Sequence, residues 1–501
     1  MLGAMLGAAC SKKVHPAPDR PAVSAKPAAA SSSALPARAV AEMWQNVRSI
    51  ELTGTWTSWE PQQSYEVDGA PRDIGTAKFV LRESRDSGQA SIAWSRQVKY
   101  PFARDYDYVD VLDSEHAEVR GVDSWYVDAP APRAMSRDHF AATWREIHQL
   151  SPLSFLTGRA PELEAILDPA THLPVRLRAH DVDETAGDST LDVVMNEWMP
   201  TGDLVVPRSM SWMLNGTTLA EVKIEQVRLN PQDAPPPPPQ LVPLASDPRA
   251  VVPYQWVLRR EAMGGYSEDD ALAKQHLERV AEGVELVAGR THNALIVEMR
   301  DHLVVIDAPL DEAYSKWVLE ACRARFSHKP IKTLVLTHHH NDHSGGARAY
   351  VAAGVEVIVG AGNQAHFRKV FEAPHHLDHD ALDTSPRPAV ITEVNDVMRL
   401  TAGSRNLVLL RIANHHAQGM LVAYLPVERI AFVADLWSPG RDQLRAPQTF
   451  ERHQDLVEAL RAAKITPRLI VGGHGGIGNY AELATAVDAG PEAAAPHHVN
   501  Q

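Results

Sequence analysis

The sequence is poor in cysteine, with only Cys10 and Cys322 among 501 residues. Two cysteines cannot form a disulfide framework or a cysteine-based zinc ribbon. Cys322 shares one helical face with Trp317 and Val318, so we expect a buried thiol rather than a nucleophile. Cysteine chemistry is therefore not expected to carry the function of this chain.

Basic residues and long apolar runs are also scarce. The chain has 49 Lys and Arg against 63 Asp and Glu, which gives a formal net charge of −14. Because no local basic cluster offsets this balance, we expect a small-molecule substrate and no nucleic-acid partner. No stretch is apolar for long enough to span a membrane. The length predicts two or three domains and leaves the oligomeric state open.

The first residues resemble the end of a bacterial lipoprotein signal. A short apolar run and small residues precede Cys10, although Gly7 stands where leucine is usual. A lipidated Cys10 would tether the protein to a membrane of the bacterial cell envelope, in the periplasm; a cytoplasmic chain is the alternative. Residues 14–40 are rich in Ala, Pro and Ser, so residues 1–40 are interpreted as a signal-like segment and a flexible linker.

Residues 41–230 mostly alternate apolar and polar side chains, which predicts an antiparallel, curved sheet. One helix is predicted here from Phe140, Trp144 and Ile147, with Ser136 as its N-cap. The turn over 168–175, followed by long hairpins, resembles the half-barrel of the lipoprotein-carrier family. The acids in this region are expected to be solvated: Asp105, Asp107 and Asp110.

A second linker, 231–253, contains five consecutive prolines and is expected to act as a stiff strut between domains. The next domain is assigned to 254–490, with a tail over 491–501. A helix is predicted over 267–282, and strands and helices alternate from Gly283 onward. This order predicts an α/β fold in which two layers of mixed sheet are covered by helices.

A histidine-rich motif follows the strand predicted over 333–337. His338, His340, Asp342 and His343 have the spacing H-x-H-x-D-H. In an extended segment His338 and His340 point to the same face, whereas Asp342 and His343 follow a turn. One metal ion could therefore bind the first pair and a second ion the other pair. Imidazole and carboxylate ligands suit Zn²⁺, with Fe²⁺ and Mn²⁺ as competitors.

Three further strand ends carry ligand-type side chains. One predicted strand is followed by His415 and His416, a second by Asp435 and a third by His474. The carboxyl ends of strands are where open α/β sites form. Although the chain has 24 histidines, chance does not easily explain seven such residues in this order. We expect a further group to lie in a solvated loop within 361–388, which is also a candidate lid: His375, His376 and His379.

The motif and the later His, Asp and His resemble the metallo-β-lactamase superfamily over about 283–489. The resemblance implies an αββα sandwich with two metal sites: His338, His340 and His416 bind the first ion; Asp342, His343 and His474 bind the second; Asp435 bridges them. His416 is preferred to His415 because His416 and Gly419 match the family's H-x-x-G pattern. His339 would point away.

Such a site implies hydrolysis. Two divalent ions about 3.5–4 Å apart can share a hydroxide that attacks a carbonyl or phosphorus centre, and Asp342 could orient it. True β-lactamases of the superfamily have cysteine or serine at the position of Asp435, and an aspartate resembles the glyoxalase II, lactonase and phosphodiesterase branches. We therefore predict a hydrolase of thioesters, lactones or carboxylic esters. The alternatives are β-lactamase or phosphodiesterase activity, and a lipid-anchored envelope binding protein with a vestigial metal domain.

Overall fold

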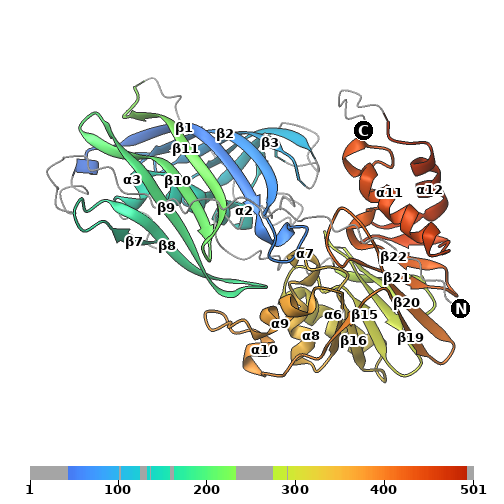
Figure 1. The fold of residues 1–501 in the computed structure, drawn as a ribbon. Helices are drawn as coiled ribbons and strands as arrows, with labels where there is room; N and C mark the ends of the chain where they lie inside the picture. The colour runs from blue at the N-terminus through green and yellow to red at the C-terminus, as the bar shows by residue number, and fades with distance from the viewer. Residues whose placement is uncertain are drawn as a thin grey trace, which may run out of the picture.

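The structure is a computed structural model that describes residues 43–100, 103–123, 132–135, 137–157, 163–232, 275–289 and 291–492. Figure 1 shows two bodies, an N-terminal curved sheet and a C-terminal sandwich. The predictions for Cys10, for the spacer before residue 41, for Ser136 and for most of the proline-rich linker lie outside the described residues. Among the helices of the described ranges, none has the length and apolarity needed to cross a bilayer.

The N-terminal body is an eleven-stranded antiparallel sheet with the order β6-β5-β4-β3-β2-β1-β11-β10-β9-β8-β7. Its elements are β1 (Ser49–Glu60), η1 (Pro61–Gln63), β2 (Arg72–Ser84), β3 (Ala90–Val98), β4 (Arg104–Leu112), β5 (Ala117–Val122), β6 (Arg133–Ala134), α2 (Arg137–Leu150), α3 (Pro152–Phe155), β7 (Glu164–Leu167), β8 (Pro174–Asp183), β9 (Gly187–Thr201), β10 (Leu204–Leu214) and β11 (Thr217–Leu229).

The alternating pattern of the strands decides which sheet face is buried. The inward residues of the strands form one core with α2 and α3, in which Trp56 packs on Trp212 with ring centroids 4.6 Å apart. The prediction of solvated acids on β4 is wrong for Asp110. It lies on the same inward face as Tyr106 and Tyr108, is 1% exposed, and accepts a hydrogen bond from the Thr143 hydroxyl.

The C-terminal body contains a seven-stranded mixed sheet and a six-stranded sheet. The first sheet and its helices comprise β12 (His276–Ala281), β13 (Val284–Ala288), β14 (Ala294–Glu298), β15 (Leu303–Ile306), α6 (Glu312–Arg325), β16 (Ile331–Val335), α7 (Asn341–Ser344), α8 (Ala347–Ala352), β17 (Glu356–Gly360), α9 (Gln364–Glu372), α10 (Ala381–Thr384) and β18 (Ile391–Val394). The second comprises β19 (Val397–Ala402), β20 (Arg405–Arg411), β21 (Leu421–Leu425), β22 (Ile430–Phe432), η3 (Ala434–Leu436), α11 (Pro447–Ala462), β23 (Leu469–Val471), β24 (Ile477–Asn479) and α12 (Tyr480–Asp488).

These elements form four layers, which confirms the αββα architecture. One core lies between the two sheets and includes α11 and α12 on the outer face of the second sheet. Another core joins the first sheet to α6, α8 and α9. Cys322 on α6 is 1% exposed, and burial raises the pKa of its thiol to about 12. The helix predicted over 267–282 is wrong at 276–281, because these residues pair with β13 as strand β12.

Two loops of the N-terminal body contact the C-terminal body. The loop between β1 and β2 reaches α7, as Figure 1 shows, and the Tyr65 carbonyl accepts a hydrogen bond from the Gln418 backbone at 2.7 Å. The β8–β9 hairpin meets the segment before α10, where the Asp188 carboxylate accepts from the backbone of His376 and Leu377. The prediction of a solvated loop over 361–388 is therefore wrong in part: α9 and α10 occupy much of it. Of its histidines, His375 is 4% exposed.

Candidate metal centre

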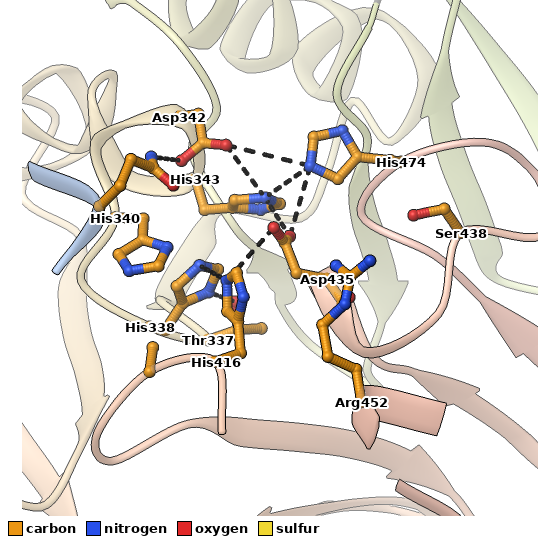
Figure 2. Close-up of polar contacts among 12 residues, drawn as sticks. Thr337, His338, His340, Asp342, His343, His416, Asp435, Ser438, Arg452 and His474 are labelled. Atoms are coloured by element: carbon orange, nitrogen blue, oxygen red, sulfur yellow. Dashed lines mark hydrogen bonds and ion pairs between the residues drawn. The ribbon is translucent and has the colours of Figure 1, made fainter. Parts of the chain in front are cut away.

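The ends of four strands bring the seven predicted residues together. His338 and His340 follow β16, and Asp342 and His343 form the first turn after it, in α7. The other three residues come from the second sheet: His416 follows β20, Asp435 lies in η3 after β22, and His474 follows β23. Figure 2 shows all seven side chains facing one space, and six of them are at most 5% exposed.

A first group consists of His338, His340 and His416, whose ring nitrogens lie within 4.8 Å of one another. The Thr337 hydroxyl donates to Asp307 at 3.0 Å, so it accepts the proton on His338 Nδ1 at 3.0 Å. His338 Nε2 is then unprotonated, and its lone pair is available to a cation. It lies 3.3 Å from His416 Nε2. This arrangement suits two nitrogens that share a cation.

A second group consists of His292, Asp342, His343 and His474. His343 Nδ1 lies 3.0 Å from the Asp307 carboxylate, and His474 Nδ1 lies 3.1 Å from the Thr291 carbonyl. Both partners only accept hydrogen bonds, so Nδ1 carries the proton on each ring. The two Nε2 atoms face each other at 3.3 Å, and Asp342 Oδ2 lies 3.8 and 3.9 Å from them.

Asp435 lies between the two groups. Its Oδ1 is 2.5 Å from His343 Nε2 and 3.4 Å from His474 Nε2, whereas its Oδ2 is 3.3 Å from His416 Nε2. Its backbone is held by the Arg452 guanidinium, which donates to the Asp435 carbonyl at 2.8 Å. One carboxylate therefore faces both groups and could bridge two ions.

The local backbone explains how these side chains reach one another. Ala434 has a φ of +46°, a left-handed conformation that turns the chain immediately before Asp435. A Cβ on Gly473 would lie 2.6 Å from the His343 ring, so glycine is required for the strand end to approach this closely. The strand that delivers His474 can then pack directly against His343.

The charge states also suit metal binding. Burial, with the neighbouring imidazoles, holds the pKa of His338 and that of His340 well below the usual value, so both are neutral ligands at pH 7. Burial opposes ionisation of Asp342 and Asp435, but His343 and other histidines bring the pKa of each carboxyl well below its usual range. Burial lowers the pKa of His343, but the two carboxylates raise it well above its usual value, so an ion that binds His343 Nε2 displaces a proton. Separations of 3.3 to 3.9 Å between ligand atoms match the edges of a coordination sphere with bonds of about 2.0–2.2 Å. The residues present therefore fit divalent cations.

Two other predicted positions lie outside these groups. His339 Nε2 lies 3.0 Å from the Ser64 carbonyl and belongs to neither group. His415 is exposed, and its Nδ1 lies 3.0 Å from the Asp455 carboxylate. Both placements leave His338, His340 and His416 as the members of the first group.

The sequence did not predict roles for His292 and Asp307. His292 Nε2 lies 3.1 Å from Asp342 Oδ2. Asp307 follows β15 with a φ of +63°, and its carboxylate is fully buried beneath the centre. Like the predicted ligands, Asp307 follows an apolar β-branched run, and this was an available sequence signal. His292 lacks this signal, because it lies two residues before β14 rather than after a strand.

The comparisons with known proteins agree with this reading. The family model described as "Metallo-beta-lactamase superfamily" matches residues 287–474, and it does not extend into the N-terminal sheet. No curated protein matches the chain.

Similar solved structures cover somewhat less than half of the chain. A metallo-beta-lactamase from Pontibacter korlensis is 19% identical, covers 43% of this chain and 97% of its own, and gives a TM-score of 0.31. One from Hirschia baltica is 19% identical over 44% of this chain and 99% of its own, with a TM-score of 0.34. The sec-alkylsulfatase Pisa1 from Pseudomonas sp. is 19% identical over 43% of this chain and 40% of its own, with a TM-score of 0.33. Because these TM-scores are low, the similarity of residues 287–474 to the superfamily rests on the family model alone.

Proposed function

Because residues 287–474 form a domain of the metallo-β-lactamase superfamily, we propose that the protein is a metal-dependent hydrolase of thioesters, lactones or carboxylic esters. The observation that carries this proposal is the position of Asp435, whose two oxygens face the two histidine groups separately. A site of this form suits a pair of divalent ions, with Zn²⁺ favoured by the ligand types and Fe or Mn as alternatives.

Each group of side chains has a distinct role in this proposal. His338, His340 and His416 would hold one ion; Asp342, His343 and His474 would hold the other. Asp435 would bind both. When bound, divalent ions lower the pKa of water toward neutrality and polarise the acceptor oxygen of a substrate.

The chain itself would position the reactants. Asp342 is 5% exposed and ionised, so it could orient the attacking water. Its Oδ2 is the oxygen that faces the histidines, within 3.1 Å of His292 Nε2. A serine or cysteine nucleophile is not needed, and the Cys322 thiol is buried in α6, away from these residues.

An aspartate at the position of Asp435 resembles the glyoxalase II, lactonase and phosphodiesterase branches, so it counts against β-lactams as substrates. The test is a hydrolysis panel on metal-loaded protein, with thioesters, lactones, aryl esters, β-lactams and phosphodiesters. We expect turnover of the acyl substrates and its loss in Asp342→Ala and Asp435→Ala. Turnover confined to β-lactams or phosphodiesters would refute the proposed class of thioesters, lactones and carboxylic esters. Equal activity of Asp342→Ala on every substrate would refute hydrolysis at this centre.

We also propose that the protein is tethered in the cell envelope through Cys10, on the lipoprotein-like pattern of its first residues. Labelling of the full chain with a radioactive fatty acid, with Cys10→Ser as control, tests this. Equal labelling of both proteins, or of neither, would refute it.

A further inference from the structure

Two residues of the N-terminal body reach the metal centre in the C-terminal body. Gln63 is the last residue of η1 and Ser64 follows it, in the loop between β1 and β2. Both are 2% exposed, although they belong to a connection between two strands. Their contacts are to metal-ligand candidates almost three hundred positions later in the chain.

The Gln63 side chain is held at both ends of its amide. Nε2 donates to Asp342 Oδ1 at 2.8 Å, and it lies 3.2 Å from Asn341 Oδ1. Oε1 accepts from the Tyr100 hydroxyl at 2.6 Å. An ionised carboxylate only accepts hydrogen bonds, so the amide has one workable orientation. Burial, with the Asp435 and Asp342 carboxylates, raises the pKa of Tyr100, which therefore stays protonated and donates.

The two Asp342 oxygens have different contacts. Oδ1 is engaged by Gln63, whereas Oδ2 is the atom that faces His292, His343 and His474. A carboxylate that is free to rotate would offer either oxygen, and it would lose rotational freedom on binding an ion. Gln63 removes that freedom before the ion binds.

The Ser64 carbonyl contacts the first histidine group. It lies 3.0 Å from His340 Nε2, so that nitrogen carries a proton and donates. His340 Nδ1 then carries the lone pair of the ring, and this atom is buried with no hydrogen-bond partner in the structure. A cation is the partner that a buried, unprotonated nitrogen lacks.

The loop is rigidly held in this place. Arg72 donates from Nε to the Gln63 carbonyl at 2.8 Å and from a terminal nitrogen to the His416 carbonyl at 2.9 Å. Its guanidinium also lies over the Tyr100 ring, 5.0 Å from the centroid. One arginine therefore ties the loop to the backbone of a residue of the first histidine group.

We propose that Gln63 is a positioning residue of the metal centre, supplied by the N-terminal domain, and that it sets the affinity of the second site through Asp342. The inference rests on the proposed metal-dependent function and adds to it a role for the N-terminal domain. Partners that orient a metal ligand typically change affinity by about 10- to 100-fold when they are removed. We expect a loss of that size at the second site and little change at the first.

Gln63→Met tests this, because methionine has a similar length and cannot donate a hydrogen bond. The matched control is Gln62→Met: the neighbouring Gln62 donates to Asp183 Oδ1 at 2.8 Å, within the N-terminal body. Zn²⁺ titration against a chromophoric chelator gives the stoichiometry and affinity of each site in the full chain. The Co²⁺ absorption spectrum reports the geometry of the second ion without any assay of activity.

The expected result is two tight ions in the wild type and in Gln62→Met, but one tight and one weak ion in Gln63→Met. If Gln63→Met does not fold, Tyr100→Phe decides, because it removes the hydroxyl that orients the amide; we expect a several-fold weaker second ion. Two equally tight ions in these variants would overturn the role of Gln63 and leave the proposed function intact. A wild type that binds no metal would overturn both.

Discussion

Asp307→Asn is expected to switch the tautomer of a metal ligand without changing its position. Asp307 Oδ1 accepts from the Thr337 backbone N–H at 2.8 Å, and Oδ2 lies 3.0 Å from both the Thr337 hydroxyl and His343 Nδ1. The Thr337 backbone N–H can donate only to the oxygen of the asparagine amide, so that oxygen takes the place of Oδ1. The amide NH₂ group then takes the place of Oδ2. That group donates, and His343 Nδ1 would have to accept. The ring proton would then move to Nε2, the atom that faces the second site.

The magnitude follows from what is lost. The volume and most hydrogen bonds are kept, so we expect the free energy of unfolding to fall by no more than about 1–2 kcal/mol. The second site loses a lone pair unless the amide rotates, so we expect its affinity for Zn²⁺ to fall at least about 10- to 100-fold. Asp307→Ala should destabilise the fold more, because it leaves two buried N–H donors unpaired at about 1–3 kcal/mol each.

The assay combines chelator competition with ¹⁵N NMR of the histidine rings, which distinguishes Nδ1–H from Nε2–H. The matched control is Asp301→Asn: Asp301 also contacts a histidine Nδ1, that of His302 at 2.9 Å, but it lies on the exposed β14–β15 turn. The control should bind metal like the wild type. Unchanged affinity and an unchanged His343 tautomer in Asp307→Asn would refute the reasoning.

Two further predictions concern pH and metal removal. Glu146 on α2 is 8% exposed, and burial raises its pKa to about 7, so the folded state keeps a proton that the unfolded state releases above about 4.5. Stability should therefore fall by up to ~3 kcal/mol as pH rises from 4.5 to 7, and urea unfolding of Glu146→Gln should lack this part of the slope; an unchanged slope would contradict it. Removing metal with a chelator should abolish hydrolysis and lower the Tm, since an ion at 1,000 times its Kd contributes about 4 kcal/mol; a Tm insensitive to chelator and to added Zn²⁺ would count against the metal centre.

The sequence predicted the position of a site residue wherever that residue directly follows the apolar run of a single strand. His338, Asp435 and His474 each follow a short apolar run, and the parallel or neighbouring strands bring such ends to one place. The same pattern carried information about Asp110, which shares the register of Tyr106 and Tyr108. That register places the Asp110 side chain on the buried face of β4.

Other features depend on contacts that no local pattern contains. Residues 276–281 have good helix formers, but pairing with β13, as between Leu277 and Val287, makes them a strand. Gln63 lies in a polar turn whose composition predicts an exposed loop. Its burial follows from the docking of two domains, and alternation within either domain says nothing about that docking.

The position of the β1–β2 loop in the chain has a consequence for biosynthesis. Whether the chain folds as it leaves the ribosome or as it enters the envelope, the whole N-terminal sheet emerges before any of the histidines of the centre, and domains commonly fold in that order. We expect Gln63 and Ser64 to be in place already when residues 338–343 emerge. The ligands would then meet an existing surface, and metal would be captured only after the later strands close over it. A pulse-labelled chain that stops before residue 416 should therefore be folded in its sheet and empty of metal.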